Sequence, residues 1–174
     1  MQIREYQFEA SRTCSDLGEE NNYTHMRLGV TTEIGEICDI FKKHLAYGKE
    51  IDLVHLGEEL ADVAWYICNH ATFTGVLAGV ETGMSECVDL EDVLVSLDFI
   101  YLQYTELVED NTYFSHPEQL GMLKTIADYY ELDFESLLDK NIAKLKVRFP
   151  EKFTQEAALN RNLVAERATL EGKW

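Results

Sequence analysis

Two short acidic stretches carry the residues of this chain whose types and spacing could do chemistry. Glu33 and Glu36 are three positions apart in the first stretch, and Glu59 and Asp62 are three positions apart in the second. Residues three apart share one face of a helix. Apolar residues at helical spacing accompany each pair, so we expect the two helices to pack together with the acids along the seam. Carboxylates gathered there repel each other and lose hydration. Bound Mg²⁺ or Mn²⁺, which prefer oxygen ligands, would relieve this cost.

A plainer interpretation exists for each pair alone. Acids at this spacing are common on solvated helix faces, and the chain is rich in acid. Glu58 is a further carboxylate of the second stretch. It is either an outward-facing charge or takes the place of Glu59 if the helix phase shifts by one residue. The presence of two pairs, both beside an apolar stripe, favours the metal site.

A basic cluster near the end of the chain is the second candidate for chemistry. Lys144 and Arg148 are four apart, with Asn141 just before them, so the three share a helix face. Lysine and arginine on one face suit phosphate oxygens. The alternative is a helix C-terminus whose cations complement the helix dipole. Carboxylates for a metal and cations for phosphate together suggest a metal–nucleotide substrate. Trp65 and Tyr66 could stack on a base or simply belong to the core.

The amino-acid composition limits the classes of protein to which this chain could belong. The 174 residues are 46% apolar, which suits one globular domain, and 15 basic against 32 acidic residues give a net charge of −17. A protein with this negative charge is not expected to bind nucleic acid non-specifically or to bind an anionic membrane surface. No signal-peptide pattern and no apolar run long enough to cross a bilayer occur. We expect a cytoplasmic protein with no nucleic-acid or membrane partner.

The elements that must position these residues are all expected to be helices. Helices are predicted over about residues 2–17, 23 or 24 to 44, 52–73, 90–108, 116–130 and 135–149, and the tail 151–174 is polar with a helical look. Asp52 is a plausible N-cap, Pro117 suits a first helical position and Pro150 stops a helix. The apolar face of 90–108 could close the bundle or meet another subunit. The fold class predicted is all-α, a four-helix-type bundle with additional helices.

At this point the motifs resemble a known family. Glu33-x-x-Glu36, a gap of 22 residues and Glu59-x-x-Asp62 resemble the E-x-x-E, E-x-x-D signature of the MazG-like, all-α nucleoside triphosphate pyrophosphohydrolases, a superfamily that includes dimeric dUTPases and dCTP pyrophosphatases. Residues 141–150 are similar to that family's N-x-x-K-L-x-x-R-[YF]-P segment. The segments that follow, Lys152-Phe153-Thr154 and Asn160-Arg161, resemble its G-F-S and N-R, although Lys152 stands where the family frequently has glycine.

The resemblance covers about residues 3–76 and 123–168. Residues 1–174 are therefore expected to form a single MazG-like domain with a helical insertion at about 77–122 and a C-terminal tail at 151–174. The insertion bears on oligomer geometry and on the substrate pocket, because relatives build both at that end of the bundle.

The resemblance implies Mg²⁺-dependent cleavage of (deoxy)nucleoside triphosphates between the α and β phosphates, giving a nucleoside monophosphate and pyrophosphate. The four signature acids would match the Mg²⁺ ligands, and Glu33 or Glu36 would also take the proton of the attacking water. The residues expected to bind substrate are Lys144, Arg148, Asn141 and Arg161. Family members act as dimers or tetramers, so we expect a homodimer or homotetramer. The alternative class is a non-catalytic acidic helical protein that binds a nucleotide or a protein partner, and the four intact acids favour the enzyme. Base and sugar preference stay open.

Overall fold

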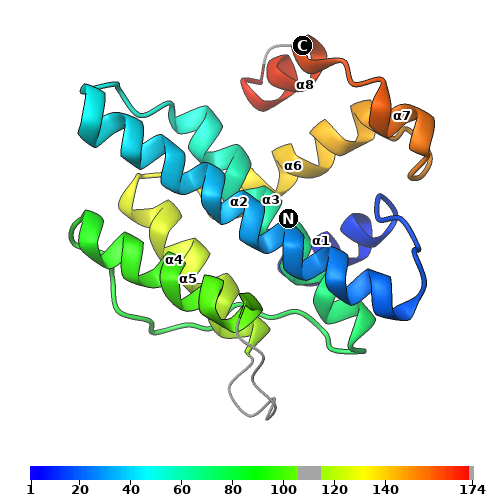
Figure 1. Ribbon diagram of the computed structural model, residues 1–174, viewed down its shortest axis with the longest axis horizontal. Coiled ribbons are helices and arrows are strands. Elements are labelled where there is room, and N and C mark those ends of the chain that lie inside the picture. The colour runs from blue at the N-terminus through cyan, green and yellow to red at the C-terminus, as the bar shows by residue number, and fades with distance from the viewer. Residues whose placement is uncertain (106–114, 173–174) are drawn as a thin grey trace.

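The computed structural model describes residues 1–105 and 115–172, and over these ranges every regular element is a helix (Figure 1). The elements are α1 (Ile3–Ser11), α2 (Glu19–Tyr47), α3 (Leu53–Phe73), α4 (Leu90–Thr105), α5 (His116–Tyr129), α6 (Phe134–Arg148), α7 (Gln155–Leu159) and α8 (Leu163–Leu170). The prediction of an all-α bundle is confirmed. A search of the described residues finds no helix long and apolar enough to cross a membrane.

The hairpin of α2 and α3 is the centre of the bundle. α4 packs on α2 and α5 on α3, while α1 and α6 cover another side of α3 (Figure 1). The turn between α2 and α3 is tight because Gly48 adopts a left-handed conformation, with φ of 64°, and closes α2 through its N–H. Asp52 then caps α3 by accepting hydrogen bonds from the N–H groups of Val54 and His55, as its position predicts. This short connection fixes the two acid-bearing helices antiparallel.

A contiguous core joins the elements, from Tyr6 of α1 to Phe149 after α6. Its centre is made by the apolar stripes of α2 and α3, which include Ile34, Ile37 and Val63. Side chains at helical spacing therefore bury the seam between α2 and α3 and leave the neighbouring acid positions at its edge.

The segment expected as an insertion belongs to the same core. Val93, Leu97, Ile100 and Tyr104 form one fully buried stripe of α4. Of the two alternatives for this face, closing the bundle is the one that the structure shows. The remainder of the helix predicted over 90–108 lies outside the described residues. Residues 74–89, which connect α3 to α4, form no regular element.

The first helix is shorter than predicted, because α1 ends at Ser11 and not near residue 17. The N–H groups of Thr13 and Cys14 bond three residues back, to Ala10 and Ser11, which tightens the chain into a turn. The Thr13 hydroxyl donates to the carbonyl of Ala10 (2.8 Å) and accepts from Trp65 Nε1 (2.9 Å). A tertiary contact with α3 thus ends the helix, and such a contact has no signature in local sequence.

Candidate functional site

Three of the four signature acids meet between α2 and α3. Glu33 comes from α2, and Glu59 and Asp62 come from successive turns of α3. One carboxylate oxygen from each lies within 4.8 Å of the others. Glu36 lines the same cavity but is exposed and lies outside this close group. The spacing therefore predicts the common location of all four acids, while the structure separates three near the seam from one at its edge.

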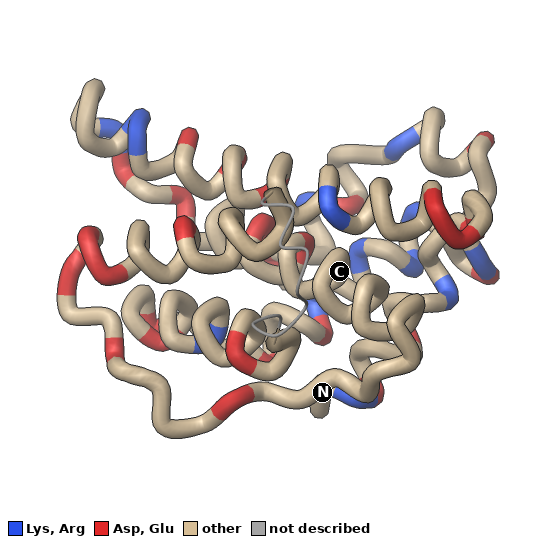
Figure 2. The backbone as a smooth tube through the Cα atoms, turned by 60° about the horizontal axis from the view of Figure 1, so that its bottom comes forward, with Lys and Arg blue, Asp and Glu red and all other residues tan. Residues whose placement is uncertain are grey.

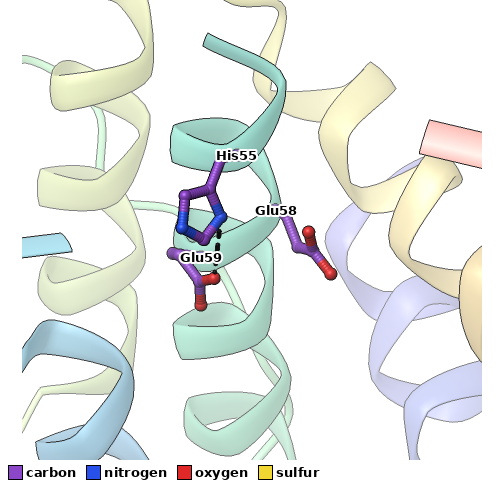
Figure 3. A group of neighbouring side chains, drawn as sticks. All are labelled: His55, Glu58 and Glu59. Carbon is purple, nitrogen blue, oxygen red and sulfur yellow. Dashed lines mark ion pairs between the residues drawn. The ribbon is translucent and has the colours of Figure 1, made fainter. Parts of the chain in front are cut away.

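The acids of α3 make contacts with two different neighbours. His55 Nδ1 lies 3.1 Å from Glu59 Oε1 (Figure 3). One ligand atom each of His55, Glu58 and Glu59 lies within 4.8 Å of the other two, so these residues form a second close group on α3. Glu58 Oε1 lies 3.1 Å from the ammonium of Lys144 on α6. Glu59 is buried and Glu58 is half-buried. The phase of α3 is thus the one expected, with Glu59 and not Glu58 at the seam.

Lys144 and Asn141 lie beneath Asp62. The Lys144 ammonium is 2.8 and 2.6 Å from the two Asp62 oxygens, and the side chain is 1% exposed. Asn141 Nδ2 donates to Asp62 Oδ1 (2.5 Å), and the Tyr6 hydroxyl donates to Asn141 Oδ1 (2.8 Å). Both residues are therefore buried partners of a carboxylate in this structure, and neither lines the cavity. The shared face predicted for Lys144 and Arg148 does not place both cations where a phosphate could reach them.

Arg148 and Arg161 line the cavity and share one buried carboxylate. Arg148 Nε and Nη2 donate to the two oxygens of Glu166 (3.0 and 2.5 Å), and Arg161 Nη2 donates to Glu166 Oε2 (2.7 Å). Burial opposes ionisation of Glu166, but these hydrogen bonds outweigh it and lower its pKa to about 2. Glu166 of α8 thus fixes two guanidinium groups at the wall of the cavity, and the sequence analysis did not find it.

The C-terminal part of the chain is the basic part of this acidic protein. Eight of the fifteen lysines and arginines follow residue 139. In the charge-coloured tube, blue segments gather toward the end of the molecule that holds α6 to α8 (Figure 2). Two arginines against one glutamate leave a net positive charge at this wall. An anion entering the cavity therefore meets its most favourable field opposite the α2–α3 acids.

The cavity itself has a volume of about 430 Å³, within the range of small-ligand sites. Its lining combines carboxylates, guanidinium groups, rings and hydroxyls: Thr13, Ser15, His25, Glu33, Glu36, Glu58, Glu59, Asp62, Trp65, Tyr66, Leu145, Arg148, Phe149, Phe153, Ala158 and Arg161. Trp65 and Tyr66 thus face the site as well as the core. The lining residues come from the turn after α1, from α2 and α3, and from α6 and the segments that follow it.

The close packing of the acids raises the pKa of two of them. Burial, and then interaction with Glu33, raises the pKa of Glu59 to about 9. Burial also raises the pKa of Glu33, and repulsion from Asp62 adds to this, while a hydrogen bond with Glu59 and the charge of Lys144 oppose it. Without another cation, Glu59 therefore keeps a proton that an ordinary carboxyl group would release at neutral pH. The donor set suits a hard divalent cation, since Glu33, Glu59 and Asp62 all offer oxygen.

No family model, curated protein sequence or solved structure matches this chain. The family resemblance therefore depends on the motif residues, and the assignment of a function depends on the geometry of the cavity.

Proposed function

We propose that this protein is a Mg²⁺-dependent nucleoside triphosphate pyrophosphohydrolase that gives a nucleoside monophosphate and pyrophosphate. The observation that carries the proposal is the joint lining of one cavity. Glu33, Glu59 and Asp62 meet on one side of it, while Arg148 and Arg161 line it from α6 and the segment before α8. A triphosphate bound with a divalent cation requires this combination of oxygen ligands and guanidinium donors.

The acids have distinct roles in this proposal. Glu33, Glu59 and Asp62 would hold Mg²⁺, with Mn²⁺ as a substitute, and Glu36 would complete the set from the cavity edge. When bound, the cation neutralises charge on the phosphate oxygens and orients them for attack by water. The proton of that water goes to Glu33 or Glu36. Glu36 is the better placed of the two, because it lies outside the close group and keeps its carboxylate exposed to the cavity.

The basic residues also have distinct roles. Arg148 and Arg161 would bind the phosphate chain, held in place by Glu166. Lys144 and Asn141 would not contact the substrate and would instead hold the Asp62 carboxylate in position through hydrogen bonds. We keep the expectation of a cytoplasmic homodimer or homotetramer as part of the proposal, since it depends on the same resemblance.

Product analysis tests the reaction class. Purified protein is incubated with each standard NTP and dNTP and with dUTP, with Mg²⁺ or with EDTA, and pyrophosphate and monophosphate are measured. We expect metal-dependent release of both products in equal amounts. Glu36→Gln should abolish turnover and leave thermal unfolding unchanged. Glu20→Gln, an exposed acid at the start of the same helix, is the matched control and should retain full activity.

Either of two results would count against the enzyme. One is inactivity on the whole panel with metal present. The other is full activity of Glu36→Gln. Nucleotide binding without turnover would then favour the alternative class, a non-catalytic acidic helical protein that binds a nucleotide.

A further inference from the structure

One end of the cavity is built from rings instead of charges. The rings of Trp65 and Tyr66 meet edge to face at 4.8 Å between centroids, and Tyr66 meets His25 in the same way at 5.8 Å. All three residues line the cavity. They come from α2 and α3, the same helices that carry the acids. The aromatic end and the acidic end are therefore two parts of a continuous wall.

One face of α2 carries both the aromatic and the acidic part of the cavity wall. His25, Gly29 and Glu33 are spaced four apart, so they follow one another along one face of α2. A Cβ on Gly29 would lie 2.1 Å from the ring of Tyr66. Glycine at this position thus lets the ring of Tyr66 lie directly against the α2 backbone, between His25 and Glu33. Tyr66 follows Asp62 by one helical turn of α3, and His25 precedes Glu33 by two turns of α2. The rings therefore lie roughly 6 to 12 Å from the carboxylates along the helix axes.

Trp65 is held in place before any ligand arrives. Its Nε1 donates to the Thr13 hydroxyl at 2.9 Å, and that hydroxyl donates in turn to the carbonyl of Ala10. The indole is therefore held by the turn after α1 through its Nε1 and contacts Tyr66 edge to face. A rigid aromatic wall of this kind binds a flat ring with little loss of side-chain freedom.

His25 is the unsatisfied member of this group. Its Nδ1 is buried and has no hydrogen-bond partner among the described residues. Burial also lowers the pKa of His25, so the imidazole is neutral at pH 7. A buried polar atom without a partner is unfavourable, and most such atoms in folded proteins are paired. Because this atom is shielded from water, a ligand at the cavity wall can supply the missing partner only after the imidazole turns about its Cβ–Cγ bond.

We propose that the aromatic end of the cavity binds a nucleobase, and that the imidazole of His25 turns on binding so that its Nδ1 hydrogen-bonds to the polar edge of that base and determines base preference. Every base offers a flat face to Trp65 and Tyr66, so stacking alone is tolerant of base identity. A directed hydrogen bond to one atom is selective, because the wrong base leaves that atom unpaired. This inference rests on the proposed function, since it assigns the base of the same nucleotide whose phosphates lie at the acids and arginines.

The experiment measures binding without metal and without turnover. The chain has two tryptophans, Trp65 and Trp174, so a Trp174→Phe background isolates the emission of Trp65. The four ribonucleosides, dCMP, dUMP, dTMP, dAMP, dGMP and pyrophosphate are titrated in EDTA. We expect saturable quenching by a subset of bases, with about a tenfold spread in affinity, and none by pyrophosphate.

Two variants at one position test the hydrogen bond. His25→Phe keeps a ring but removes the nitrogen, and should lower affinity for the preferred base about tenfold and flatten the preference. His25→Gln restores a polar side chain and should recover part of the affinity. Unchanged emission of Trp65 in the free variants shows that the aromatic wall is intact.

Three results would overturn the inference: no quenching by any base, equal affinities for all bases, or the same preference in His25→Phe as in the parent. Its failure is distinguishable from failure of the proposed function. Metal-dependent hydrolysis with no effect of His25→Phe on base preference would reject the role of His25 alone. Selective, His25-dependent quenching with no hydrolysis of any triphosphate would reject the enzyme and keep the base subsite.

Discussion

Replacing Glu59 by glutamine should stabilise the metal-free protein. In the folded chain the pKa of Glu59 is about 9, against an ordinary value of 4.5, mainly because the carboxyl is buried next to Glu33 and Asp62. At pH 7 the unfolded chain ionises this group and the folded chain keeps it protonated. Folding must therefore take up a proton against a gap of 7 − 4.5 = 2.5 pH units, which costs about 3 kcal/mol at 1.36 kcal/mol per unit.

Glutamine removes this cost because it is neutral in both states. Its side-chain oxygen can still accept a hydrogen bond from His55, the partner of Glu59 at 3.1 Å. For a chain of this length each kcal/mol shifts the melting temperature by about 2–4 °C. We therefore expect Glu59→Gln to melt about 6–12 °C above the parent at pH 7 in EDTA.

The pH dependence has a definite sign. The folded state binds this proton more tightly than the unfolded state, so the contribution of Glu59 to stability falls as pH rises from about 4.5 toward 9. At pH 5 the same arithmetic leaves a difference below about 1 kcal/mol. Thermal unfolding in EDTA at pH 5 and pH 7 measures both values. Glu36→Gln, in the same cavity but exposed, is the matched control and should melt close to the parent. A Glu59→Gln protein that melts at or below the parent at pH 7 would refute the reasoning.

Three further predictions concern the surroundings of the same group. Mg²⁺ binding at pH 7 should release protons, since Glu59 must ionise to bind a cation, and calorimetry in buffers of different ionisation enthalpy measures that release. Lys144→Met should destabilise the protein by about 3 kcal/mol in urea unfolding, because Asp62 loses its buried counter-charge, and a neutral effect would contradict this pairing. Gly29→Ala should destabilise by about 1–3 kcal/mol, because its methyl group overlaps the ring of Tyr66, and Gly35→Ala, whose Cβ meets nothing within 4 Å, is the control.

The part of the site that sequence predicts is the part fixed by local geometry. Three-residue spacing places Glu33 beside Glu36 and Glu59 beside Asp62 in any regular helix, and the short turn after α2 leaves few ways to pair the helices. The apolar stripes set which side of each helix is buried. The same stripes leave Glu58 and Glu59 as alternatives, because a shift of one residue in helix phase exchanges them, and it is the burial of Glu59 in the structure that decides between the two.

The part that sequence does not predict depends on how distant helices pack. Lys144 and Arg148 share a face of α6, but α6 crosses α3 so that Lys144 is buried under Asp62 while Arg148 reaches the cavity. Glu166 is an ordinary acid of the polar tail in sequence, and only the docking of α8 on α6 brings it to the arginines. Neither position carries a local signal, because charged residues are normally solvated and their burial depends on a tertiary partner.

The burial of Lys144 changes how charge is balanced in the whole site. Its ammonium contacts both oxygens of Asp62 and one of Glu58, so one fixed positive charge already offsets part of the acid on the α6 side of α3. Of the three close acids, Glu33 and Glu59 contact no lysine or arginine among the described residues, and these are the two whose pKa is raised. One divalent cation would match their two charges when both ionise. The anion-binding role expected of Lys144 then passes to the two arginines that Glu166 holds at the opposite wall, which separates the places for cation and phosphate within one cavity.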